Sequence, residues 1–177
     1  LVERGDFGSR MNTALAKLGV FMEVSRVWVV QDRADRGAAR LTYEWCAQSV
    51  APRAEGRQEL PREEMDAIRR LLVEEGRICS ADVRTLPDGI RTILEPGGVR
   101  SLLVYPLCDG SEFAGLIGFD ELGRIRQWND NELRILKTAS AIISTALDHE
   151  AALDGLRATE DNFLSFFDTV DDLIVID

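Results

Sequence analysis

The sequence predicts an α+β fold, in which a central antiparallel sheet of about five or six strands carries helices on both faces. Residues 99–108 and 112–121, joined by a turn at 109–111, are apolar on both faces of each strand, so this part of the sheet needs cover above and below. Apolar residues recur at helical spacing over 61–76 and again from 129 onward. A chain of 177 residues suffices for one such domain and a short extension.

An N-terminal helix and a hairpin come first. Ser9 is a suitable N-cap for a helix over 9–23. Its apolar face has members four, three and four residues apart: Met11, Leu15, Leu18 and Met22. Residues 25–32 predict a buried strand, and a turn at 35–37 leads to a second strand of alternating polarity. On that strand we expect one face with Leu41, Tyr43 and Trp45 and the other with Thr42, Glu44 and Cys46.

The middle of the chain predicts shorter elements. Residues 50–60 are polar and predict a loop, after which Pro61 suits the first turn of a helix that ends at Gly76. The expected apolar face of this helix consists of Met65, Ile68, Leu72 and Val73. Residues 78–83 predict a short strand, and a helix of one or two turns follows and ends at Leu94.

A long helix begins at Asn129 or Asp130, either of which is a good N-cap, with Glu132 in the first turn. One apolar stripe is expected to face the sheet: Leu133, Leu136, Ser140, Ile143 and Leu147. A second stripe alternates steps of four and three, the repeat of a coiled coil, and predicts a homodimer through this helix. Its members are Ile135, Ala139, Ile142, Ala146, His149, Leu153 and Leu156. The alternative is that the C-terminal extension is a frayed linker.

Charge and hydropathy exclude several classes of partner. The net charge is −10, and residues 148–177 hold nine acids and one base, against 22 acids and 20 bases before them. This acidic tail repels phosphate backbones, so we expect no nucleic acid. No stretch approaches the roughly 18 apolar residues that span a bilayer, and no signal peptide is visible. We therefore expect a cytoplasmic protein without membrane contact, and the missing initiator Met suggests a piece of a longer chain.

No catalytic motif is recognisable in the sequence. It has neither a phosphate-binding glycine loop nor a nucleophile elbow. Cys46, Cys79, Cys108 and His149 are separated by 33, 29 and 41 residues, which matches no metal-ligand spacing. An odd number of widely spaced cysteines suits a reducing compartment, where they act as small apolar side chains. We expect no catalytic residue and no metal site.

Several motifs in order resemble the GAF domains of bacterial and archaeal sensor proteins. They are Thr42-Tyr43-Glu44-Trp45-Cys46-Ala47, residues 101–107 (SLLVYPL) and residues 115–121 (GLIGFDE). Arg126-Gln127-Trp128, followed by Glu132 and the long helix, resembles the C-terminal end of that family. The segment from Thr159 to Val175 resembles the opening of a PAS domain, and the order GAF–helix–PAS is similar to that of multi-domain sensor histidine kinases. The resemblance implies a GAF domain at 9–147, a signalling-helix extension at 148–158 and a truncated PAS domain at 159–177.

The resemblance also implies a sensory role without catalysis. A small molecule of unknown identity is expected between one sheet face and the covering residues 50–96, with a signal passing through the C-terminal helix to PAS and kinase domains of the same chain. The candidate ligand contacts are Trp28, Tyr43, Trp45, Arg100, Ser101, Tyr105, Phe113 and Phe119. These aromatic residues are equally well explained as parts of a packed core.

Two other functions stay open from the sequence. One is a ligand-free GAF domain that serves only for dimerisation and spacing. The other is a cysteine-based methionine sulfoxide reductase, which requires an exposed thiol of low pKa. The cofactor is unknown, because the cysteines and His149 match no bilin or haem motif. Phe119-Asp120-Glu121 also lacks the Asn-Lys pair of the cyclic-nucleotide-binding members.

Overall fold

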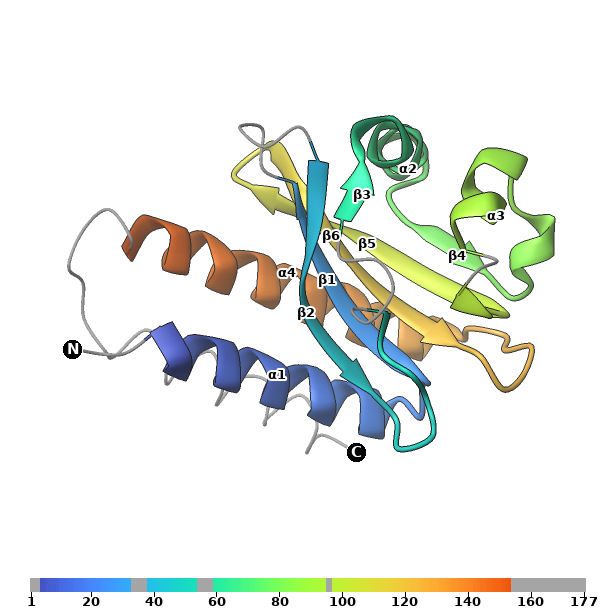
Figure 1. The fold of residues 1–177 in the computed structure, drawn as a ribbon, viewed down its shortest axis with the longest axis horizontal. Coiled ribbons are helices and arrows are strands. Elements are labelled where there is room, and N and C mark those ends of the chain that lie inside the picture. Colours follow the sequence, from blue (N-terminus) through green and yellow to red (C-terminus); the bar gives the residue numbers. More distant parts are fainter. Residues whose placement is uncertain (1–3, 33–37, 54–58, 95–96, 154–177) are drawn as a thin grey trace.

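The computed structural model describes residues 4–32, 38–53, 59–94 and 97–153 and contains a six-stranded antiparallel sheet in the order β3-β2-β1-β6-β5-β4 (Figure 1). The strands are β1 Arg26–Asp32, β2 Ala38–Cys46, β3 Glu59–Pro61, β4 Ile78–Ser80, β5 Ser101–Asp109 and β6 Glu112–Glu121. The helices are α1 Arg4–Phe21, α2 Arg62–Glu75, α3 Asp88–Leu94 and α4 Asp130–Leu153, with a 3₁₀ turn, η3, at Val83–Thr85. The predicted α+β class is confirmed.

Helices cover both faces of the sheet, as its apolar strands require (Figure 1). α1 and α4 share one face, called here the α4 face, with a core that includes Leu15, Leu103, Ile117, Phe119, Leu136 and Ile143. α2 and α3 share the other, the α2 face, with a core that includes Val30, Met65, Ile68, Leu72, Leu102 and Leu116. Each of these cores contains residues of the central strands, so the sheet is the shared wall of two apolar layers.

Helix α4 is fixed to the sheet by polar contacts as well as by its apolar face. Asn129 and Glu132 form a reciprocal capping box: Glu132 N donates to Asn129 Oδ1 at 3.0 Å, and Asn129 N donates to Glu132 Oε2 at 2.8 Å. The cap predicted from the sequence is therefore confirmed. Tyr105 on β5 donates its hydroxyl to the carbonyl of Leu133, and Ser144 Oγ bonds both the N–H and the carbonyl of Cys108.

Two β-bulges interrupt the strict alternation of faces, and the first overturns the predicted grouping of Leu41 with Tyr43 and Trp45. In β2 the register with β1 skips Thr42, so Leu41 lies in the α2-face core while Tyr43 and Trp45 contact the α4-face core. In β6 the register with β5 skips Ala114, so Phe113 lies on the α2 face, opposite Ile117 and Phe119. Each bulge adds one residue to its strand, so the side chains after it point to the opposite face from the one that strict alternation predicts. The sequence pattern alone does not show where a bulge occurs.

Other elements differ from expectation at their ends. Part of the predicted loop 50–60 forms β3, which pairs with β2, and β4 ends at Ser80 instead of residue 83. Val73 is 74% exposed, so the buried face of α2 consists only of Met65, Ile68 and Leu72. The turn predicted at 35–37, Leu156 and the PAS-like segment 159–177 lie outside the described residues.

The two predicted stripes of α4 are not separated as expected. Ala139 and Ala146, assigned to a partner chain, are buried in the same core as Leu136 and Ile143. Ile135 and Ile142 are half-buried against that core, and His149 is exposed. The reason is that α1 lies beside α4 on this face (Figure 1), so a wider arc of α4 is covered within the chain than a sheet alone would cover. The dimer interface on α4 stays a prediction. Within the described side chains it now depends on Ile135, Ile142 and His149, which are not fully buried within the chain.

We predict that Gly115→Ala destabilises the protein by about 2–3 kcal/mol, because a Cβ there would overlap the main-chain carbonyl oxygen of Val30 on β1. Main chain in the middle of a sheet has little freedom to move away. The matched control is Gly89→Ala in α3, where a Cβ meets nothing within 4 Å. That change should be neutral or stabilise by up to about 1 kcal/mol, as alanine favours helix. Urea unfolding measures both, and equal effects would contradict the account.

Candidate functional site

A buried ion cluster lies on the α2 face where β1 begins and β6 ends. Arg26 and Asp120 are cross-strand partners, and Arg26 Nη2 lies 3.1 Å from Asp120 Oδ2. Arg53, from the segment after β2, donates to the same oxygen from Nη2 at 2.8 Å and from Nε at 3.2 Å. The side chains of Arg26 and Asp120 are 3% and 0% exposed, and that of Arg53 is 19% exposed. Two guanidinium groups thus share one carboxylate oxygen from which water is almost excluded.

Three polar atoms of this region have no hydrogen-bond partner among the residues that the structure describes. They are Nε of Arg26, Nε1 of Trp28 and Oδ1 of Asp120. Trp28 is 5% exposed and follows Arg26 on the same face of β1. A buried donor or acceptor without a partner costs about 1–3 kcal/mol, so such atoms call for a bound water, ion or ligand. The three atoms are two hydrogen-bond donors, Arg26 Nε and Trp28 Nε1, and one acceptor, Asp120 Oδ1.

The surrounding contacts hold these side chains in place. The Arg53 guanidinium lies over the Trp28 ring, 4.9 Å from its centroid, and the Arg53 main-chain N–H donates to Glu44 Oε1 at 2.9 Å. Arg26 Nη2 also donates to the carbonyl of Gly97 at 3.0 Å. The indole of Trp28 occupies the space where a side chain at Gly118 would lie. We call Arg26, Trp28, Arg53 and Asp120 the site cluster.

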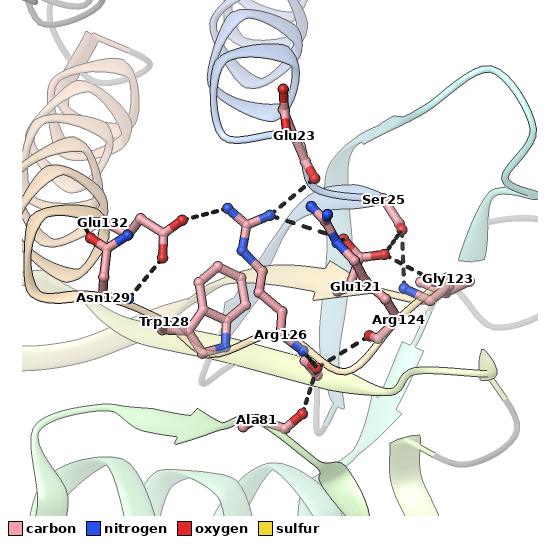
Figure 2. Close-up of polar contacts among 12 residues, drawn as sticks. Glu23, Ser25, Ala81, Glu121, Gly123, Arg124, Arg126, Trp128, Asn129 and Glu132 are labelled. Atoms are coloured by element: carbon pink, nitrogen blue, oxygen red, sulfur yellow. Dashed lines mark hydrogen bonds and ion pairs between the residues drawn. The ribbon is translucent and has the colours of Figure 1, made fainter.

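A second polar network joins the same end of the sheet to the start of α4 (Figure 2). Arg126 Nη2 donates to Glu132 Oε1 at 2.6 Å, and its Nη1 donates to the carbonyl of Glu23 at 3.0 Å. The same Nη1 lies 4.0 Å from Glu121 Oε2. Figure 2 shows the guanidinium between Glu132 and Glu23, with the Trp128 ring beside it, 4.9 Å from centroid to Cζ. Arg126 therefore contacts both the sheet end and the capping box of α4.

Glu121 is the buried acid of this network. Its Oε1 accepts hydrogen bonds from Ser25 Oγ at 3.0 Å and from the Gly123 N–H at 2.9 Å. Its Oε2 lies 3.6 Å from Nε of Arg124. Because Glu121 follows Asp120 on β6, the two carboxylates belong to opposite faces of one strand. One strand end therefore carries an acid of the site cluster and an acid of the α4 network.

The structure divides the predicted ligand residues between the two faces. Trp28 and Phe113 are on the α2 face, whereas Tyr43, Trp45, Tyr105 and Phe119 belong to the α4-face core. Ser101 is fully buried; its hydroxyl donates to the carbonyl of Ala81 and accepts from the Arg126 N–H. The exposed Arg100 lines a hollow of about 170 Å³ beside Asp82 and Arg84. The eight residues do not meet in one place, and their role in ligand binding stays a prediction.

Sequence reasoning missed Arg26, Arg53 and Asp120. The available signal was a charge beside an apolar run: Asp120 directly follows Gly118 and Phe119, and Arg26 directly precedes Val27. Charged residues in such positions are seldom buried unless paired, so they point to a specific partner. Nothing in the sequence indicated that Arg53 would be part of a site, because it lies in a polar segment that is predicted to be a loop.

The described residues also enclose an open hollow apart from the site cluster. This hollow, of about 640 Å³, lies where the end of α1 meets the segments after β2 and β6, and it contains no residue of the site cluster. Within the described ranges, no group of three or more His, Cys, Asp or Glu residues could hold a metal ion. No helix in the same ranges is both long and apolar enough to cross a membrane.

The cysteines differ in their exposure. Cys79 is exposed on the edge strand β4, and Cys46 and Cys108 are half-buried. Burial raises the pKa of the Cys46 thiol to about 11, with the nearby carboxylate of Glu44 acting in the same direction. Burial also raises the pKa of Cys79. Raised values disfavour the thiolate on which reductase chemistry depends.

The GAF domain family model matches residues 6–147 of this chain. The methanogenesis regulatory histidine kinase FilI of Methanothrix harundinacea is 29% identical over 136 residues, which cover 75% of this chain and 15% of the kinase. The chain thus spans only about 15% of the length of that curated relative.

Solved structures share the fold. The blue-light-absorbing form of the PixJ GAF domain from Thermosynechococcus elongatus superposes with a TM-score of 0.70 at 19% identity, over 92% of this chain and 98% of that one. The phycocyanobilin-bound GAF domain from a cyanobacterial phytochrome gives a TM-score of 0.69 at 18% identity, over 81% and 85% of the two chains.

We predict that Asp120→Asn costs about 3–5 kcal/mol of unfolding free energy, because two arginines would lose the carboxylate they share in a buried place. The matched control is Asp88→Asn. Asp88 is 86% exposed and pairs with Arg91 at the surface, so its loss should cost less than about 1 kcal/mol. Chemical denaturation of the three proteins tests this, and similar losses in both variants would refute a special role for Asp120.

We also predict that Cys46 of the folded protein is alkylated about tenfold or more slowly at pH 8 than in urea. A rise in pKa from 9.0 to about 11 lowers the thiolate fraction about 100-fold, and the greater nucleophilicity of the more basic thiolate recovers about tenfold of this. The rate should increase with pH up to about 11. Residue-resolved mass spectrometry measures it, and rapid native alkylation of Cys46 would revive the reductase alternative.

Proposed function

This chain belongs to the GAF domain family, and on that premise we propose that it is the ligand-binding sensory part of a larger signalling protein. Its ligand is a small polar molecule bound at the site cluster on the α2 face. The parent protein is a sensor histidine kinase of the two-component type, in which α4 leads toward a PAS domain. The relative FilI, a histidine kinase that the chain covers only in small part, supports this placement.

One observation carries the ligand proposal: three polar atoms of the site cluster have no hydrogen-bond partner in the part of the chain that the structure describes, and their side chains are no more than 5% exposed. A core built only for stability would be expected to avoid them, because each costs about 1–3 kcal/mol. A ligand that accepts hydrogen bonds from Arg26 Nε and Trp28 Nε1 and donates one to Asp120 Oδ1 would remove that cost. An amide, a lactam or a heterocyclic base edge has the required pairing of acceptor and donor.

A covalent tetrapyrrole is not part of the proposal, although phycocyanobilin is bound by one of the similar GAF domains. Attachment through sulfur requires a thiolate. Cys46 is the cross-strand partner of Arg26 and so lies beside the site cluster, but burial raises the pKa of its thiol to about 11. We therefore propose a ligand held by hydrogen bonds.

The output of the domain is proposed to be the arrangement of two α4 helices in a homodimer. Ile135 and Ile142 are only half-buried within one chain, so their remaining apolar surface is available to a second copy. A GAF domain that binds nothing and only dimerises is the second candidate. It is favoured by the filled apolar cores on both faces of the sheet.

The ligand proposal is tested with Trp28→Phe, which removes the unpartnered indole N–H and keeps an aromatic ring under Arg53. We expect the 177-residue chain, incubated with a metabolite extract below about 1 kDa and examined by native mass spectrometry, to retain a small molecule. Trp28→Phe should lower its occupancy about fivefold or more. The control Trp45→Phe changes a tryptophan on the opposite face and should retain the molecule. No retained molecule, or equal retention by both variants, would contradict the proposal.

The dimer is tested with Ile142→Asp, which places a charge on the half-buried side of α4. We expect the wild-type chain to be a dimer in analytical ultracentrifugation and the variant to be a monomer with an unchanged helical circular dichroism signal. Ala141→Asp, at an exposed neighbouring position, should stay dimeric. A monomeric wild type, or a dimeric Ile142→Asp variant, would show that this side of α4 is not the interface.

A further inference from the structure

We propose that Arg126 is the positioning residue that couples the site cluster to helix α4, by dividing its guanidinium between Glu121 at the sheet end and Glu132 in the capping box. The inference rests on the proposed function in that it takes the site cluster as the sensing end. It adds the physical connection by which a change at Asp120 reaches the helix.

The first step of the connection is a double contact between β1 and β6. Arg26 pairs with Asp120 on the α2 face, and the preceding residue, Ser25, donates to Glu121 Oε1. The main chain joins the same positions, because Ser25 N donates to the carbonyl of Asp120 at 2.9 Å. Ser25 Oγ also accepts from the Leu122 N–H at 3.0 Å. A rearrangement of the Arg26–Asp120 pair therefore moves strand ends that carry the Glu121 carboxylate.

The second step is the unequal sharing of Arg126. Its Nη2 lies 2.6 Å from Glu132, whereas its Nη1 lies 4.0 Å from Glu121, at the limit of an ion pair. The Arg126 side chain is only 11% exposed, so water screens these interactions weakly. A shift of the guanidinium toward Glu121 strengthens its attraction to that acid and weakens its attraction to Glu132. A small displacement of Glu121 changes the balance between these two attractions.

The third step depends on Glu132, which accepts hydrogen bonds from both Arg126 and the capping box. One carboxylate oxygen accepts from Arg126, and the other accepts from the Asn129 N–H and closes the capping box. Movement of Arg126 toward Glu121 would withdraw the charge that holds the Glu132 carboxylate in this geometry. The first turn of α4 would then lose part of its cap, which is worth about a factor of five in the local opening equilibrium.

Three other contacts limit the movement of the Arg126 side chain. Its main-chain N–H donates to the buried Ser101 Oγ, which fixes the residue to β5. Its guanidinium lies beside the Trp128 ring, and its Nη1 donates to the carbonyl of Glu23 (Figure 2). These contacts hold the main chain of Arg126 and one side of its guanidinium, and we infer that its remaining movement is between the two acids.

The experiment measures how the site cluster affects the first turn of α4, using amide hydrogen exchange of Glu132 and Leu133 by NMR on the 177-residue chain. Asp120→Asn serves as the perturbation, and Arg53→Met is a milder one for use if the first fails to fold. In the wild-type background we expect the perturbation to change protection of these amides about fivefold or more. In the Arg126→Met background the change should fall below about 1.5-fold.

Two further backgrounds separate coupling from a merely structural role. Arg124 also lies near Glu121 but is 59% exposed, and within the described residues its ion pair is with Glu121 and not with α4, so Arg124→Met should keep the full response. Arg126→Lys retains the charge without the planar fork and should restore part of it. Equal responses with and without Arg126, or no response in any background, would overturn the proposal. Because no ligand is used, the result is independent of the ligand test.

Discussion

The architecture depends on a carboxylate with no exposed surface. Asp120 lies on the central strand β6, and its charge is balanced by Arg26 on the neighbouring strand and by Arg53 from the segment after β2. Arg26 in turn reaches the carbonyl of Gly97, just before β5. The buried carboxylate of Asp120 thus brings together segments that are far apart in the sequence. Its ion pairs connect β1 to β6 and hold the Arg53 segment against both strands.

A cluster of this kind is an unusual choice for stability alone. Apolar residues of similar volume often stabilise a core as well as buried ion pairs do, because the pair must first be desolvated. Here the desolvation cost is increased by atoms of Arg26, Trp28 and Asp120 that have no hydrogen-bond partner within the described ranges. The apolar layers on the two faces of the sheet supply the free energy that offsets this cost. The apolar layers thus supply net stability, whereas the buried ion cluster determines which segments of the chain meet.

The sequence allowed the element types and the layers to be predicted, because apolar periodicity reports which side of an element is buried. It did not allow the faces of Leu41 and Phe113 to be predicted, since each lies beyond a bulge that changes the count by one. The aromatic residues were the obvious ligand candidates, yet Tyr43, Trp45, Tyr105 and Phe119 fill the α4-face core. The site cluster is formed by charges that meet only when distant segments fold together, and no local pattern encodes such a meeting.

The anchoring of Ser144 to Cys108 fixes the rotation of α4 about its own axis as well as its position. From that point each added residue turns the helix by about 100° and lengthens it by about 1.5 Å. A fusion to a foreign output domain would therefore keep its rotational phase only when the joint changes the residue count by about seven, or two turns. Intermediate lengths would present a different side of the helix to whatever follows, so joint length alone could invert the response of a chimeric receptor.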